Sequence, residues 1–217
     1  MLIQLPSVDV VFAPPAYRLI TGAEATDAHV QQTDDLAADS FTGDTPVDPA
    51  RYRAWLAKNS RILLCLLDAS GVVVGYGDLL PLTAPAVDAL VRGTRTEQTI
   101  DGADLCAGND PCPAGLYLTG LAVRDPASYR GRCNALRLLW GLCRLVADHY
   151  LPAPDATATV YAVAASAPGA RWLRRFGFTV RVAAAERADQ RDLYHCAVNH
   201  QSAAPLVMRC AAAASRR

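Results

Sequence analysis

The sequence predicts a single α/β domain built around a mixed sheet. Short apolar runs typical of buried strands alternate with segments whose apolar residues recur every three or four positions, the spacing of an amphipathic helix. The 217 residues contain no repeat and no linker long enough to divide them into two domains. At 52% hydrophobic and 19% charged residues, the chain can bury a sizeable core, which excludes a disordered protein. We therefore expect helices packed on the faces of one sheet.

Local start and stop signals bound the elements in the first half of the chain. Asp48 can cap a helix whose first turn contains Pro49, with Tyr52 and Trp55 on one face. Residues 69–71 form a tight connection between two runs rich in Ile, Leu and Val, which predicts a hairpin. The expected elements are a strand at 17–20, helices at 21–41 and 48–59, strands at 61–68 and 72–80, and an elaborated loop at 83–113 with a short helix at 86–91.

Strand and helix alternate in the second half. Pro152 and Pro154 end a long helix, and Gly177 is placed to end a shorter one in the left-handed conformation. Pro168 suits the first turn of that shorter helix. The expected elements are strands at 116–123, 158–164, 178–182 and 206–210, and helices at 131–150 and 169–176.

Charge and cysteine content exclude several classes of protein. The 21 basic and 21 acidic residues cancel, so no overall field attracts nucleic acid or an anionic membrane. The seven cysteines are odd in number and lack paired CxxC spacing, a pattern that fits neither a disulfide framework nor a metal site. No apolar run approaches the length of a membrane span. We therefore expect a cytoplasmic protein with reduced thiols and no nucleic-acid or membrane partner.

A strand, an arginine-rich turn and a helix start together indicate an anion site. The strand ends at residues 121–123, and residues 130–135, Arg-Gly-Arg-Cys-Asn-Ala, open the next helix. A helix start presents backbone N–H groups and the positive end of a dipole, so phosphate oxygens can bind where the residues are small. Arg130 and Arg132 add cations at the same point. A solvated surface turn explains the same residues, so both interpretations stay open at this step.

Two motifs resemble those of the GNAT superfamily of acyl-CoA-dependent N-acyltransferases. Residues 121–139 are similar to its pyrophosphate loop, Leu-Ala-Val followed by Arg/Gln-x-x-Gly-x-Gly/Ala. Residues 166–178 are similar to the next motif, Asn-x-x-Ala-x-x-Leu-Tyr-x-x-x-Gly-Phe. The resemblance implies a mostly antiparallel sheet with splayed central parallel strands, in a domain at 17–210 between an N-terminal lead at 1–16 and a tail at 211–217.

The resemblance also implies a reaction and its cosubstrate. A GNAT enzyme moves an acetyl group from acetyl-CoA to an amine by direct attack in a ternary complex, and here the acceptor would be a small molecule or a protein. The coenzyme would lie between strands 116–123 and 158–164. The residues implied to contact it are Leu121, Ala122, Val123, Arg130, Gly131, Arg132, Cys133, Asn134, Ala135 and Ser166.

Some positions depart from the motifs. Cys133 replaces the first glycine of the loop, Ser166 replaces the asparagine, and Leu173 replaces the tyrosine that would protonate the departing thiolate. These departures keep a second hypothesis open, a catalytically weak or inactive module that binds or senses CoA. The candidate replacement acids are Tyr161 and Tyr194. The candidate bases are Glu97, Asp101 and Glu186. The alternative for each of these three carboxylates is a solvated loop position without a catalytic role.

The only indication of the amine acceptor is the distribution of charged residues along the chain. Residues 19–50 contain seven carboxylates and no Lys or Arg, which suggests a cationic amine acceptor or, alternatively, a solubilising helix face. A dinucleotide oxidoreductase is disfavoured because the first strand-to-helix turn lacks GxGxxG. The sequence leaves the oligomeric state open, a homodimer included.

Overall fold

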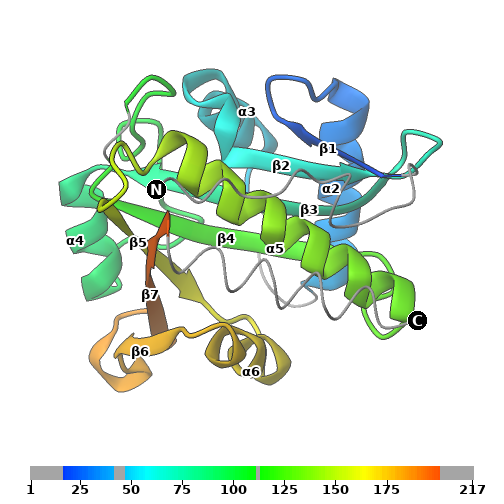
Figure 1. Ribbon diagram of the computed structural model, residues 1–217. Helices are drawn as coiled ribbons and strands as arrows, with labels where there is room; N and C mark the ends of the chain where they lie inside the picture. The colour runs from blue at the N-terminus through cyan, green and yellow to red at the C-terminus, as the bar shows by residue number, and fades with distance from the viewer. Residues whose placement is uncertain (1–16, 42–46, 111–112, 201–217) are drawn as a thin grey trace.

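The computed structural model describes residues 17–41, 47–110 and 113–200, and it confirms the predicted fold class (Figure 1). Seven strands form one sheet in the order β1-β2-β3-β4-β5-β7-β6, and all neighbours pair antiparallel except β4 and β5. The strands are β1 Arg18–Thr21, β2 Leu63–Leu67, β3 Val73–Leu82, β4 Gly115–Val123, β5 Thr157–Val163, β6 Thr179–Val182 and β7 Leu193–Asn199. The α-helices are α2 Asp27–Ser40, α3 Pro49–Lys58, α4 Ala84–Arg92, α5 Tyr129–His149 and α6 Ala167–Arg175.

Capping groups decide where the first two helices begin. Asp48 accepts a hydrogen bond from the Arg51 backbone N–H at 3.0 Å, so α3 starts at Pro49 as predicted. The helix expected from residue 21 starts later, at Asp27. Thr26 and His29 form a reciprocal capping box that fixes this start, because each side chain bonds to the other residue's backbone N–H.

The predicted β2–β3 hairpin is confirmed. The Asp68 carboxylate accepts hydrogen bonds from the backbone N–H groups of Ser70 and Val72, and Gly71 has a φ of 82°, a left-handed conformation that favours glycine. Residues 61 and 62, expected as the start of a strand, instead belong to a 3-10 turn at 60–62 that follows α3 directly.

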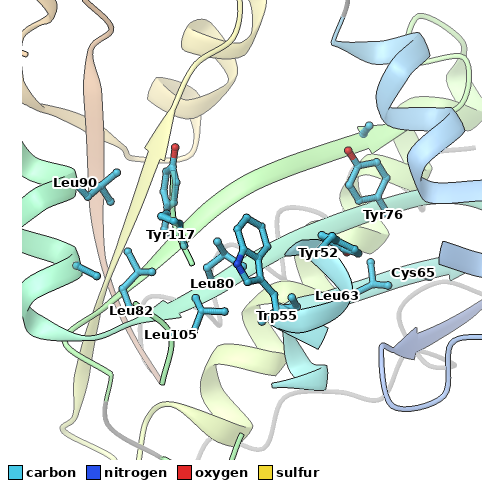
Figure 2. Close-up of a cluster of buried hydrophobic side chains, with 14 of the residues drawn as sticks. Tyr52, Trp55, Leu63, Cys65, Tyr76, Leu80, Leu82, Leu90, Leu105 and Tyr117 are labelled. Atoms are coloured by element: carbon cyan, nitrogen blue, oxygen red, sulfur yellow. The ribbon is translucent and has the colours of Figure 1, made fainter. Parts of the chain in front are cut away.

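Helices cover both faces of the sheet. Figure 1 shows α5 crossing one face, while α2 and α4 lie on the other. Gly75 and Gly77 on β3 allow α5 to approach, because a Cβ atom at either position would meet Leu138 or Leu142 of that helix at 2.7 and 3.1 Å. The opposite face holds a second apolar cluster that contains Trp55, drawn in Figure 2. The two cores contain residues of β2, β3, β4, β5 and β7, so the sheet is packed on both faces.

The last strand of the sheet differs from the prediction. Strand β7 at Leu193–Asn199 was not expected, yet it lies between β5 and β6 and pairs with both. Its burial comes from these two neighbours and not from a continuous apolar run of its own. The strand expected at 206–210 lies outside the described residues. Helix α6 ends as predicted, with Gly177 at a φ of 86°.

Within the described ranges, the cysteines at positions 65, 106, 133, 143 and 196 form no disulfide. No group of three or more His, Cys, Asp or Glu side chains in this part of the chain is arranged to hold a metal ion. None of the helices in the same residues is both long enough and apolar enough to cross a membrane.

Candidate functional site

The central parallel strands separate and leave a cleft. Strands β4 and β5 pair over only three positions, the last being Leu118 with Ala162. Beyond that pair, β4 continues to Val123, whereas β5 ends at Val163 and the chain turns into α6. The resulting cleft has a volume of about 1790 Å³ and is lined by both strands and by the starts of α5 and α6. The splayed pair is therefore the feature that creates the site.

The open edge of β4 presents backbone donors to this cleft. Arg124 donates its backbone N–H to the Val74 carbonyl of β3 at 3.0 Å. Because N–H groups alternate between the two edges of a strand, those of Leu121 and Val123 point to the edge that β5 has left. A β-bulge lies nearby, since Asp78 pairs with Gly120 and Leu79 with Leu118, so Thr119 is the additional residue. These backbone N–H groups could donate hydrogen bonds to a carbonyl oxygen of a ligand, including the oxygen of an amide.

The first turn of α5 is tightly built. Ser128 caps it by accepting from the Gly131 backbone N–H at 2.9 Å and donating to the Asp125 carbonyl at 2.8 Å. A Cβ atom on Gly131 would lie 2.1 Å from that carbonyl oxygen, so only glycine fits here. The Arg132 backbone N–H donates to the Ser128 carbonyl at 3.1 Å. The amides of these two residues are thus used within the helix start and do not form an open phosphate cradle.

The structure divides the residues expected to contact the coenzyme into two sets. Seven of them line the cleft: Leu121, Ala122, Val123, Arg132, Cys133, Ala135 and Ser166. The other three are Arg130, Gly131 and Asn134, which do not line it. The cleft-lining set includes Cys133, the residue that stands in place of a glycine, and its side chain is buried.

Arg130 and Asn134 make contacts elsewhere. The Arg130 guanidinium donates to the Tyr17 hydroxyl at 2.6 Å. The Asn134 side chain accepts from Arg137 at 2.8 Å, and both residues are buried. The Arg137 guanidinium also stacks 4.2 Å from the centre of the Tyr17 ring. These side chains tie the start of β1 to α5, which is a structural role.

Helix α6 begins at the opposite wall of the cleft. Ser166 caps it by accepting from the Gly169 backbone N–H at 3.2 Å, and both residues line the cleft. Trp172 and Arg175 of the same helix also line it. Together with Arg132 from α5, Arg175 places positive charge on both sides of the gap between the splayed strands. This end of the cleft suits a long anionic ligand with an apolar middle portion.

The other end of the cleft contains a buried carboxyl that the sequence analysis missed. Asp78 of β3 is 8% exposed, lines the cleft, and accepts a hydrogen bond from the Tyr52 hydroxyl at 2.8 Å. Burial raises the pKa of Asp78 to about 8, with further contributions from the Glu97 and Asp34 carboxylates, while the Tyr52 hydrogen bond acts in the opposite direction. A single acidic residue inside an otherwise apolar strand was the signal that could have revealed it.

The three carboxylates nominated as bases lie in different places. Glu97 lines the cleft, close enough to Asp78 to contribute to its raised pKa. Asp101 is exposed, does not line the cleft, and lies 4.0 Å from the Arg95 guanidinium. Glu186 is exposed in a 3-10 turn away from the cleft. Of the three, only Glu97 lines the cleft.

Neither tyrosine nominated as an acid lines the cleft. Tyr194 is 1% exposed, and its hydroxyl accepts from Arg174 at 2.9 Å. Tyr161 is partly buried, with its ring 2.7 Å from where a Cβ atom on Gly115 would be. The tyrosines that do line the cleft are Tyr52, Tyr76, Tyr117 and Tyr129.

The acidic first quarter of the chain reaches the site at two positions. Asp34 and Asp35 of α2 line the cleft, on the side opposite the arginines of α5 and α6. Burial raises the pKa of Asp34 and the neighbouring Asp35 adds to the shift, while Arg53 lowers it. Arg132 and Arg175 thus line the cleft at the splayed strands, while Asp34 and Asp35 line it at α2 together with Arg53 of α3.

Comparisons with known proteins agree with this geometry at the level of fold. No protein-family model matches the sequence, and no curated protein does either. The loading GNATL domain of CurA from Lyngbya majuscula matches with a TM-score of 0.57 at 12% identity, over 85% of this chain and 98% of that one.

Two further solved structures contain a coenzyme. The GphF GNAT-like decarboxylase in complex with isobutyryl-CoA has a TM-score of 0.55 at 18% identity, over 84% of this chain and 99% of its own. The GNAT family N-acetyltransferase YhbS from Escherichia coli, in complex with CoA, has a TM-score of 0.50 at 16% identity, over 88% of this chain and 87% of its own. With its splayed β4 and β5 and the helices that start at their ends, the chain has the GNAT fold.

Proposed function

We propose that this protein transfers an acyl group, acetyl in the simplest case, from a CoA thioester to an amine. One observation carries the proposal: a single continuous cleft joins the splayed strands and their arginines to the buried carboxyl of Asp78. The GNAT fold of solved neighbours that contain CoA or isobutyryl-CoA supports the choice of cosubstrate.

The residues of the cleft fit a CoA thioester. The free N–H groups of Leu121 and Val123 could pair with the amides of the pantetheine arm, and the small side chains of residues 162–165 leave room beside them. Arg132 and Arg175 supply cations for the phosphates. Because the first-turn amides of α5 are used internally, we expect these side chains to contribute more than the backbone does.

Asp78 is the proposed base. An alkylamine has a pKa of about 10, so it must lose a proton before it can attack a thioester. A carboxylate with a pKa of about 8 is a better proton acceptor than an ordinary aspartate. Transfer forms the N–C bond and breaks the C–S bond. The proton that the ammonium gives to Asp78 passes on to solvent, and the second proton lost by the nitrogen ends on the thiolate sulfur. A backbone N–H of the open edge of β4 would stabilise the oxyanion.

The second candidate function is a module that binds CoA without efficient transfer. It is favoured by the occupied amides of Gly131 and Arg132 and by Leu173, which stands where relatives have a tyrosine. Calorimetric titration with acetyl-CoA, followed by a thiol-release assay with a panel of amines, separates the two. Binding with thiol release supports the transferase, binding without release supports the module, and absence of binding contradicts both.

Replacing Arg132 with alanine is expected to weaken binding of CoA about tenfold, because a charge-assisted contact to phosphate is lost. Arg130→Ala is the matched control, since that guanidinium contacts Tyr17 and does not line the cleft. Titration calorimetry at low and high salt measures both variants. Equal losses from the two substitutions would contradict the assignment of Arg132.

A further inference from the structure

The acceptor end of the cleft carries carboxylates at two depths. Asp78 lies at the inner level, 8% exposed on β3, and Asp34 and Asp35 lie at the outer level, exposed on α2. All three line the same cleft, and Asp34 is near enough to raise the pKa of both Asp78 and Tyr76. The two levels are thus electrostatically connected through the space of the cleft.

Protein cations do not neutralise these three carboxylates. In the described ranges, the ion pairs within 4.0 Å include none of Asp34, Asp35 or Asp78. Arg53 acts on Asp34 only at longer range, and its effect is smaller than that of burial. A cation supplied by a ligand would therefore reduce the mutual repulsion of the carboxylates without displacing a cation already paired with them.

Two buried tyrosines provide a second, independent indication of a ligand. Tyr76 and Tyr117 are each 4% exposed and line the cleft. Among the residues that the structure describes, neither hydroxyl has a hydrogen-bond partner. Figure 2 shows both hydroxyl oxygens pointing away from the leucine cluster that packs below the rings. Neither hydroxyl oxygen is among the fully buried atoms without a partner, so both stay accessible from the cleft, where a ligand that donates hydrogen bonds can reach them.

These observations favour one chemical class. An ammonium group donates hydrogen bonds to carboxylate and phenol oxygens and is attracted to the faces of aromatic rings. Inner and outer carboxylates on one cleft suit a molecule with two such groups joined by a short chain. We propose that the acceptor is a small aliphatic diamine or polyamine, whose reacting amine meets Asp78 and whose second amine stays protonated against Asp34 and Asp35.

This inference rests on the proposed transfer reaction, and its test separates the two. Thiol release from acetyl-CoA is measured with 1,4-diaminobutane, with n-butylamine, which lacks the second cation, and with 4-aminobutanoate, which replaces it by an anion. We expect kcat/KM to be about tenfold or more higher for the diamine than for butylamine, and lowest for the carboxylate. Equal values for the diamine and butylamine, or a preference for 4-aminobutanoate or for a peptide amine, would overturn the proposal.

Variants locate the second cation. Asp34→Asn and Asp35→Asn should raise KM for 1,4-diaminobutane about tenfold in combination while kcat changes little, so that the preference for the diamine over butylamine disappears. Asp39→Asn is the control for each single substitution, because it removes one negative charge from α2 at a position that does not line the cleft. If the control loses the preference for the diamine as well, the preference depends on the overall negative charge of α2, which contradicts a contact of the second amine with Asp34 and Asp35.

A binding measurement keeps the inference testable if no amine releases thiol. Calorimetric titration of 1,4-diaminobutane into the protein saturated with CoA should show binding that the Asp34→Asn, Asp35→Asn double variant loses. In that case the transfer reaction fails while the diamine site stands. No binding to the unmodified protein, or equal binding to the double variant, overturns the diamine site itself.

Discussion

Replacing Asp78 with asparagine is expected to lower the rate of acetyl transfer at saturating acetyl-CoA by about 100-fold or more. Asparagine keeps the size of the side chain and can keep the contact with the Tyr52 hydroxyl, but it cannot accept a proton from the amine. Affinity for CoA should not change, because the proposed phosphate contacts are made by Arg132 and Arg175 and not by Asp78. Steady-state thiol release and calorimetry measure the two quantities.

The pH profile identifies the role of this carboxyl. Burial raises the pKa of Asp78 to about 8, so the unmodified protein should gain activity as pH rises and level off above that value. Asp78→Asn should lose this rising limb. Asp88→Asn on α4 is the control, since that side chain is exposed and does not line the cleft. An unchanged limb in the Asp78 variant would assign the base to another group.

The Asp78 carboxyl also makes the stability of the fold depend on pH. Its pKa is about 8 in the folded protein and 3.8 for an ordinary aspartate, so between these values the folded state binds more protons than the unfolded state. Stability contributed by the protonated carboxyl is therefore present at low pH and is lost as pH rises toward 8. A tenfold difference in proton affinity between the two states corresponds to about 1.4 kcal/mol.

Urea unfolding separates this effect from catalysis. The unmodified protein should be less stable at pH 8 than at pH 5, and Asp78→Asn should reduce that difference because asparagine does not ionise. The variant is expected to lose activity at pH 8 without losing stability. A variant less stable than the unmodified protein at pH 8 would mean that the loss of activity reflects folding.

Gly131→Ala is expected to destabilise the protein by about 2 kcal/mol or more. The added Cβ atom would lie 2.1 Å from the Asp125 carbonyl oxygen and 2.8 Å from that of Arg124, so either the turn or the first turn of α5 must move. Both contacts are to backbone, which cannot rotate away as a side chain can. Thermal unfolding should show a fall in Tm of roughly 5 °C or more.

The substitution should also weaken binding of CoA, because the start of α5 lines the cleft. Gly102→Ala is the matched control, since a Cβ atom there meets nothing within 4 Å. If Gly131→Ala changes Tm no more than Gly102→Ala does, the close packing of the 124–128 turn against α5 is not required for the fold.

Elements whose signals are local could be predicted from the sequence. Asp48 and Pro49 start α3, residues 69–71 close the β2–β3 hairpin, and Gly177 ends α6, as expected. Each signal acts within a few residues, through a cap, a turn or a left-handed φ. Strand β7 has no comparable local signal, because its pairing with β5 and β6 determines its burial.

The residues of the candidate site also differ in how far the sequence could predict them. The motifs identified the strand end at Leu121, Ala122 and Val123 and the cleft-lining Arg132, Cys133, Ala135 and Ser166. They also nominated Arg130 and Asn134, which are close to these residues in sequence, but helical geometry turns their side chains toward Tyr17 and Arg137. Neighbours along a helix point in different directions, so a motif read as a continuous stretch includes residues from the wrong face.

Sequence alone therefore determined the fold class, the splayed-strand end of the cleft and the acidic character of α2, because these depend on periodicity, on local caps and on a short motif. Tertiary structure alone decided the part of the cleft around Asp78. Asp78, Asp34 and Glu97 come from three separate segments, and only the fold brings them to one cleft. The raised pKa of Asp78 depends on burial and on those neighbours, and burial is a property of the packed molecule.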